Sequence, residues 1–316
     1  MLKQFKSNIA LVYAVCIIFI LSATAGVFYK TIPERYHFFS WYSGMLQKVE
    51  RSNVFDYILT VLVLLVTGYF INKAFNKTSF YSKNTGFPIF VYILIASTIS
   101  DFYFHSYFIL DLLFSLVFLK IIDLDQNKTA IHVSFLSGIL IGCSFLFSFW
   151  LLPVGTVVFY SLLTFRPFQY REWLVGLLGM VIPAIYLFSI QYLNSSSIVV
   201  NSNVTNPNIV QYYWYDFASF FLLLTVVLIA LINLAKQFRF QSNIERRQVN
   251  ILAFFTSITF ILSVVIYWMY GIWYMLFTVP LTLLISLPIL NMKKGKVLSL
   301  ITATLLIINL LRIYVF

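Results

Sequence analysis

Charged residues are scarce in this chain. Of its 316 residues only 10% are charged, whereas 61% are hydrophobic. A soluble domain carries about 25% charged and about 45–50% apolar residues. A chain of this length cannot enclose a core large enough to hide the apolar excess. The composition therefore excludes an ordinary soluble fold and predicts a protein whose surface is largely solvated by lipid.

Cysteine is nearly absent, and familiar catalytic motifs are missing. The two cysteines, Cys16 and Cys143, both lie in apolar runs, which argues against a disulfide framework and against a cysteine-based metal cluster. The sequence contains no glycine-rich phosphate loop and no HExxH, GxSxG or CxxC motif. We therefore predict no metal and no cofactor.

The chain contains instead a series of long apolar runs. A helix needs about 20 predominantly apolar residues to cross a bilayer. We place such runs at residues 8–29, 53–72, 87–100, 107–122, 131–148, 150–165, 173–193, 212–235, 250–268, 271–290 and 297–315. They predict a single integral membrane domain over residues 1–316, an all-α polytopic transmembrane helical bundle of about 11 spans. Ten or twelve spans stay open, because the run at 87–100 is short and the Trp150–Pro153 corner can be read in two ways.

The positive charge is distributed unevenly along the chain. Cytoplasmic loops of membrane proteins accumulate Lys and Arg. If the N-terminus lies inside and each run reverses the chain, 16 of the 21 basic residues lie inside; the five outside are Lys30, Arg35, Lys48, Arg51 and Arg312. This excess predicts a bacterial inner-membrane protein with a cytoplasmic N-terminus and a periplasmic C-terminus. It also explains the net charge of +11 without a nucleic-acid partner.

Two long segments fall on the outer side in this arrangement. Residues 30–52 carry an aromatic, apolar stripe between charged ends, which is typical of a helix lying in the membrane interface. Residues 194–211 carry no charge and many turn-forming residues, and they predict a flexible periplasmic loop.

Asp111 is the acidic residue that stands inside an apolar run, about one turn into residues 107–122. An ionised carboxylate in that position costs about 2.5–3.5 kcal/mol on membrane-insertion scales. Two interpretations stay open. The side chain faces a cavity, a partner or a proton path, or it reaches the interface and pairs there with a nearby Asn or Ser.

Further candidate residues lie in the outer loops. Asp101 and His105 are four residues apart in the turn between two spans, so both point the same way if that turn is helical. Such a pair suits a carboxylate-oriented general base or a weak metal ligand, or it is a solvated turn. Glu34 precedes Arg35 just outside the first span. It is either a catalytic carboxylate or half of a surface ion pair.

The segment RPFQYREW, residues 166–173, is the most distinctive in the chain. Arg166 and Arg171 indicate a cytoplasmic loop, and Trp173 is typical of an interfacial anchor. Glu172 can pair with either arginine in a structural hinge. Alternatively, two arginines beside a tryptophan can bind anionic lipid head groups.

This segment also carries a family resemblance. The pattern RPF-x-x-REW, with LDLLFSLVFLKIIDL before it and IERRQVNIL and VPLTLLISLP after it, resembles an uncharacterised family of inner-membrane proteins from Bacteroidota, classed as a domain of unknown function. The resemblance covers most of the chain. It implies fold and location, and it implies no activity.

The order of the elements looks similar to that of the GT-C glycosyltransferases, which use polyprenyl-phosphate sugars. This resemblance implies that Glu34 acts as the base and that Arg35, Lys48 or Arg51 lies near the lipid phosphate. The chain departs from those enzymes in two ways. The Asp-Glu or Asp-bearing signature of their first outer loop is missing, and so is their large soluble C-terminal domain.

Three functions follow from these observations. The first is an enzyme of cell-envelope biogenesis that transfers sugar from a polyprenyl-phosphate donor, with Glu34 or Asp101 deprotonating the acceptor. The second is a non-catalytic scaffold or assembly subunit of a membrane complex, which the small number of polar residues in the apolar runs favours. The third is a transporter that depends on Asp111. The expected partners are membrane lipids, a polyprenyl-phosphate sugar or another membrane protein.

Overall fold

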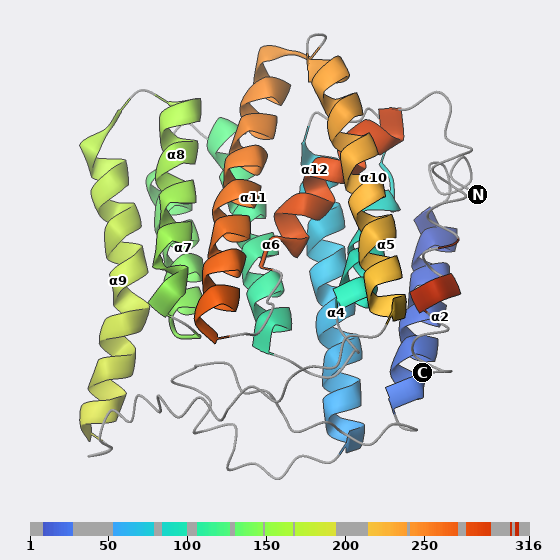
Figure 1. The fold of residues 1–316 in the computed structure, drawn as a ribbon. Helices are drawn as coiled ribbons and strands as arrows, with labels where there is room; N and C mark the ends of the chain where they lie inside the picture. Colours follow the sequence, from blue (N-terminus) through green and yellow to red (C-terminus); the bar gives the residue numbers. More distant parts are fainter. Residues whose placement is uncertain are drawn as a thin grey trace.

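The computed structural model describes residues 9–27, 53–78, 84–99, 106–126, 130–147, 149–166, 168–193, 214–238, 241–270, 276–291, 304 and 307–309. These residues form helices and their connections, and they contain no strand (Figure 1). The predicted all-α fold is therefore confirmed for this part of the chain.

Most of the predicted apolar runs correspond to helices. In chain order these are α2 (Ile9–Val27), α4 (Asn53–Lys77), α5 (Phe87–Ile99), α6 (Ser106–Gln126), α7 (Ile131–Phe145), the 3-10 helix η1 (Phe149–Gly155), α8 (Thr156–Phe165), α9 (Tyr170–Leu193), α10 (Trp214–Phe238), α11 (Asn243–Tyr270) and α12 (Thr278–Asn291). Several boundaries differ from the prediction. α4 and α6 continue to Lys77 and Gln126, beyond the predicted ends at residues 72 and 122. α11 begins at Asn243 instead of residue 250, and α12 begins at Thr278 instead of residue 271. Residues 170–173 open α9 instead of completing a loop.

Four helices are long and apolar enough to cross a membrane, over Ile58–Lys77, Tyr170–Ser189, Phe220–Phe238 and Asn243–Trp268. Their outward faces carry large apolar side chains, such as Leu178 on α9 and Phe221 on α10, which are 57% and 64% exposed. Apolar surface of this extent fits contact with lipid better than contact with water. The total number of spans and the positions of the termini stay predictions.

Two short helices lie in the interior of the bundle. α5 and α12 have 13 and 14 residues, or about 20 Å at 1.5 Å per residue, whereas the hydrocarbon core is about 30 Å thick. They pack against each other, and α12 also packs against α10 and α11 (Figure 1). Every residue of α12 from Thr278 to Leu290 is buried. The longer helices therefore surround a protein-lined centre.

Hydrogen bonds and ion pairs fix the direction of the first four described helices. Tyr13 of α2 accepts a hydrogen bond from Asn72 of α4 at 3.0 Å. The side chain of Asn76 bonds both backbone groups of Thr85, which precedes α5. Lys77 forms an ion pair with Asp123 of α6. The N-termini of α2 and α5 therefore lie at the same end of the bundle as the C-termini of α4 and α6.

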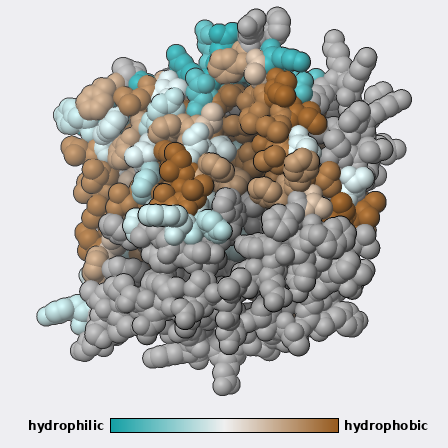
Figure 2. Space-filling view, in the orientation of Figure 1, coloured by the Kyte–Doolittle hydropathy of each residue, from teal (hydrophilic) through white to brown (hydrophobic). Residues whose placement is uncertain are grey.

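We call this end the basic end. Arg166, which follows α8, reaches the same region because its guanidinium donates to the carbonyl of Leu124 near the C-terminus of α6. The turn between α10 and α11, close to Arg246 and Arg247, is at this end too (Figure 1). Figure 2 shows hydrophilic residues gathered there above apolar flanks. The opposite end carries the other ends of the first four described helices: Val27 of α2, Asn53 of α4, Ile99 of α5 and Ser106 of α6.

Glycines bring the backbones of α7 and α9 into direct contact. A Cβ atom added to Gly138 of α7 would lie 2.3 Å from the carbonyl oxygen of Gly176 in α9, and one added to Gly179 would lie 2.5 Å from the carbonyl oxygen of Phe135. Small residues at a membrane helix interface allow this close approach. The tightest helix pair therefore depends on the absence of side chains.

We expect Gly138→Ala and Gly179→Ala each to lower the free energy of unfolding by about 1–3 kcal/mol, because backbone atoms cannot move aside for the added methyl group. The control is Gly155→Ala, where the added atom would meet the flexible side chain of Met180 at 3.0 Å. Thermal unfolding in detergent measures the difference. Equal stability of all three variants would contradict the close contact between α7 and α9.

Candidate functional site

Asp111 lies where three helices meet in the interior. The residue is 2% exposed. Its Oδ1 accepts a hydrogen bond from the Thr278 hydroxyl at 2.5 Å, and its Oδ2 accepts one from the Tyr92 hydroxyl at 3.2 Å. Asp111 belongs to α6, Tyr92 to α5, and Thr278 is the first residue of α12. We call these three side chains the Asp111 centre.

The centre lies nearer to the opposite end of α6 than to the basic end. Residues 111 to 123 of α6 rise about 18 Å along the helix axis, and Asp123 forms the ion pair with Lys77 at the basic end. Ser106, where α6 begins, lies about 8 Å from Asp111 along the same axis.

Hydroxyl groups offset the cost of burying this carboxylate. An ionised Asp at the membrane centre costs about 2.5–3.5 kcal/mol, and a hydrogen bond to a charged group contributes about 1.5–3 kcal/mol. Asp111 contacts Thr278, the first residue of α12. This contact adds a smaller favourable contribution to the free energy of the buried carboxylate, because a helix N-terminus attracts negative charge. The two hydrogen bonds can therefore offset the free-energy cost of burying the ionised carboxylate.

Other hydrogen bonds fix the surroundings of the centre. The backbone N–H of Leu276, just before α12, donates to the hydroxyl of Ser263 in α11 at 3.1 Å. Farther along α5, Ser97 accepts a hydrogen bond from Asn309 at 2.7 Å. Among the described residues, the side-chain oxygen of Asn309 is buried without a hydrogen-bond partner. Polar contacts therefore continue along α5 from Tyr92 toward the opposite end.

The hydrogen-bond partners of Asp111 in the structure are a tyrosine and a threonine rather than an Asn or Ser. The two interpretations of its role stay predictions. Sequence reasoning missed Tyr92 and Thr278. The available signal was a hydroxyl inside the apolar runs 87–100 and 271–290, but many other hydroxyls in such runs bond only to their own helix.

The segment RPFQYREW is built around a buried ion pair. Nη1 of Arg166 lies 3.5 Å from Oε1 of Glu172, which is 3% exposed. The same Oε1 accepts a hydrogen bond from the backbone N–H of Ala130 at 3.3 Å, and Arg166 donates to the carbonyl of Leu124 at 3.3 Å and 3.4 Å. The pair thus connects the end of α6 and the starts of α7 and α9.

The two arginines of this segment differ in their surroundings. Arg171 is exposed, and its guanidinium lies 5.8 Å from the ring centroid of Tyr170. The ring of Trp173 stacks on Phe159 at 4.9 Å and lies 5.1 Å from Phe168. The hinge interpretation therefore describes Arg166 and Glu172, whereas lipid binding by Arg171 stays a prediction.

The predicted catalytic and phosphate-binding residues of the outer loops lie outside the described residues. These are Glu34, Asp101 and His105, and Arg35, Lys48 and Arg51. The structure does describe the helix ends that flank them. Residues 28–52 connect Val27 to Asn53, and residues 100–105 connect Ile99 to Ser106. All four flanking ends lie at the end opposite the basic end.

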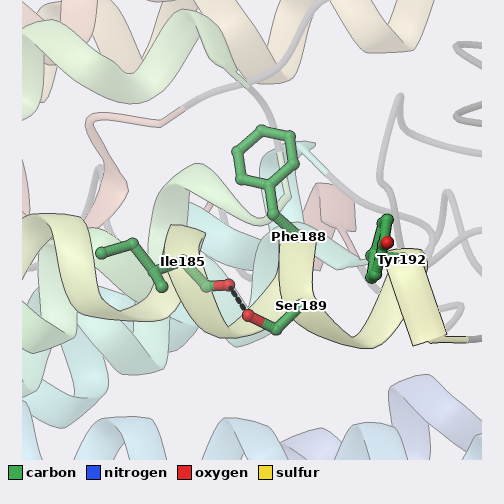
Figure 3. Close-up of a pocket in the computed structure, with 4 residues that line it drawn as sticks. All are labelled: Ile185, Phe188, Ser189 and Tyr192. Carbon is green, nitrogen blue, oxygen red and sulfur yellow. Dashed lines mark hydrogen bonds between the residues drawn. The ribbon is translucent and has the colours of Figure 1, made fainter.

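An open hollow of about 500 Å³ lies on the outer surface of α9. It is lined by Ile185, Phe188, Ser189 and Tyr192 (Figure 3). The Ser189 hydroxyl donates to the carbonyl of Ile185 at 2.9 Å, so its hydrogen bond is made within its own helix. The hollow is an apolar surface suited to a lipid chain, and it brings together no groups for catalysis.

We expect Thr278→Val to lower the free energy of unfolding by about 1–3 kcal/mol, because it removes one donor from a buried carboxylate. The control is Thr282→Val, one turn farther along α12, where the hydroxyl bonds only to the carbonyl of Thr278. In an Asp111→Leu background the effect of Thr278→Val should shrink, with a coupling energy of about 0.5–3 kcal/mol. Denaturation of the four variants in detergent measures it, and additive effects would contradict the contact.

We expect Glu172→Ala to lower the free energy of unfolding by about 1–3 kcal/mol, because it leaves the Arg166 guanidinium largely buried without its counter-charge. Arg171→Ala should change stability by less than about 0.5 kcal/mol, since its side chain is on the surface. The same thermal assay compares the two. A larger loss of stability in Arg171→Ala than in Glu172→Ala would contradict the pairing of Glu172 with Arg166.

Comparison of the chain with protein families, with curated proteins and with solved structures finds no match. The resemblances to a Bacteroidota membrane family and to the GT-C glycosyltransferases therefore stay predictions. What the structure establishes is a helical bundle with several apolar, membrane-length helices and a carboxylate centre in its interior.

Proposed function

We propose that this chain is a bacterial inner-membrane protein of cell-envelope biogenesis with glycosyltransferase-like architecture. It acts at the outer face of the membrane on a polyprenyl-phosphate sugar. The observation that carries this proposal is the position of the helix ends that flank the predicted catalytic residues. The ends on either side of Glu34 and those on either side of Asp101 and His105 lie at one end of the bundle.

The charge distribution supports the assignment of that end to the outside. The positive-inside rule makes the basic end cytoplasmic, so the opposite end faces the periplasm. The flanking helices pack on one another, α2 on α4 and α5, and α4 on α6, which supports the proposal that the two segments contribute to one site. Glu34 or Asp101 would take the proton of the acceptor hydroxyl. The basic residues Arg35, Lys48 and Arg51 would stabilise the leaving phosphate.

The element order also agrees with the resemblance. α2 and α4 are separated by the long segment 28–52, and they are followed by the short α5 and by α7, η1 and α8, which turn back at the Trp150–Pro153 corner. Fold-level similarity of this kind is an analogy, and the activity depends on the outer-end residues.

A non-catalytic scaffold is the second candidate, and α9 favours it. Only 28% of the window Tyr170–Ser189 is buried, and Tyr186 on the outer face is 70% exposed. α9 packs mainly on α7 through glycine contacts. Its outer face is therefore open to lipid or to an apolar partner helix.

Purified protein in liposomes, supplied with radiolabelled polyprenyl-phosphate sugars, tests the enzymatic proposal. We expect transfer of label, and a fall of about 10²-fold or more in Glu34→Gln or Asp101→Asn, because general-base catalysis contributes about that much. Glu245→Gln in α11, at the basic end, is the control and should keep full activity. Full activity in both outer-end variants would reject their catalytic roles.

Absence of transfer by folded wild-type protein would reject the enzyme and leave the scaffold. In that event a photo-crosslinking residue at Tyr186 should capture a membrane protein in cells, whereas the same residue at buried Val158 of α8 should not.

A further inference from the structure

The proposed chemistry at the outer face does not use the Asp111 centre. We propose that Asp111 is a proton-binding site and that the binding and release of this proton change the position of α12. The chain would then carry a proton-coupled conformational change of the kind that secondary transporters use. This inference does not rest on the proposed sugar transfer.

The chemistry of its partners suits Asp111 to hold a proton. Asp111 is enclosed in the interior, and its hydrogen-bond partners among the described residues are the neutral hydroxyls of Tyr92 and Thr278. Because no cation is bonded to Asp111 among the described residues, a bound proton is the group that can neutralise its charge. Both hydroxyls can also accept a hydrogen bond, so the centre suits the protonated acid as well as the carboxylate.

We assign the proton to Asp111 rather than to one of the ionisable side chains on the neighbouring helices. Tyr107 of α6 is in electrostatic contact with Tyr92, and both are phenols. The described residues of α12 carry no ionisable side chain. The other ionisable side chains whose surroundings are described on α4, α7 and α8, the helices packed against α6, are Tyr69, Lys73, Lys77, His132, Cys143 and Tyr160.

Asp111 lies nearer to the opposite end of the bundle than to the basic end. Asp111 lies about 8 Å along α6 from Ser106, where the helix begins at the opposite end, but about 18 Å from Asp123. The shorter route for a proton therefore leads to the opposite end. The polar contact between Ser97 and Asn309 lies farther along α5 toward that same end.

Hydrogen bonds connect the Asp111 centre to the start of α12. Side chains hold the start of this helix at two points, Asp111 to Thr278 and Ser263 to the N–H of Leu276. A hydrogen bond to a carboxylate is roughly twice as strong as one to a neutral acid, and the N-terminus of a helix attracts negative charge. Loss of the proton therefore tightens the contact between α6 and α12, and its binding loosens the contact.

The geometry of α5 and α12 suits such a movement. Both helices are shorter than the bilayer, and both lie inside the bundle against each other. Unusually short helices at the centre of a bundle are one pointer to a transporter binding site. A change at the start of α12 is thereby transmitted to the helices that surround it.

Infrared difference spectroscopy of the protein in lipid vesicles, recorded between acidic and alkaline pH, tests the proposal. The chain has ten Asp and Glu residues, so the diagnostic signal is the part of the carboxylic-acid carbonyl band that the wild type shows and Asp111→Asn lacks. We expect such a part, accompanied by a change in the backbone amide band that Asp111→Asn largely loses. Ser161→Ala, which removes a buried hydroxyl of α8 that bonds the carbonyl of Val158 in its own helix, should keep both signals.

Thr278→Val provides a second measurement that does not depend on folding of the Asp111 variant. Loss of a hydrogen bond should move the carbonyl band and reduce the amide change. An acid band that is identical in the wild type and Asp111→Asn, or that stays unmoved in Thr278→Val, would refute the proton site. An amide change that is equal in all variants would refute the coupling to α12. Sugar transfer plays no part in the readout, so each proposal can fail without the other.

Discussion

In the hydrocarbon interior a polar group has no water to bond, so each one must find a partner within the protein. Most buried hydroxyls of this bundle satisfy the constraint locally, as Ser144, Ser161 and Thr259 do by donating to carbonyls of their own helices. Asp111 and Glu172 cannot, because a carboxylate needs donors. Their donors come from other elements, and these two residues therefore determine which helices lie together.

The Arg166–Glu172 pair and the Asp111 centre act at different depths. The ion pair, with the ion pair between Lys77 and Asp123, fastens the basic end, where α6, α7 and α9 converge. The Asp111 centre connects α5, α6 and α12 about 18 Å deeper along α6. Between them, apolar side chains and the glycine contact of α7 with α9 fill the bundle. The two ion pairs lie near solvent at the basic end, whereas hydroxyl groups bond the buried carboxyl group of Asp111 in the interior.

This arrangement relates the two proposals to each other. The helix ends that flank Glu34, Asp101 and His105 lie at the end opposite the basic end, and Asp111 lies about 8 Å along α6 from that end. A sugar-transfer site and a proton site would therefore open to the same face. Their chemistry differs, since the sugar-transfer site needs a base that is exposed to an acceptor. The proton site needs an acid that is surrounded by hydroxyl groups.

Composition and the lengths of the apolar runs are enough to predict an all-helical membrane protein, a short run at 87–100 and an acidic residue, Asp111, among apolar ones. These predictions need no knowledge of contacts between residues. The contacts of Asp111 with Tyr92 and Thr278, and the pairing of Glu172 with Arg166 rather than Arg171, are visible only in the packed bundle. Thr278 lies 167 positions from Asp111, and an apolar run with several hydroxyls does not reveal which one turns away from its own helix. The roles of Glu34, Asp101 and His105 stay predictions, because no packing of described residues bears on those side chains.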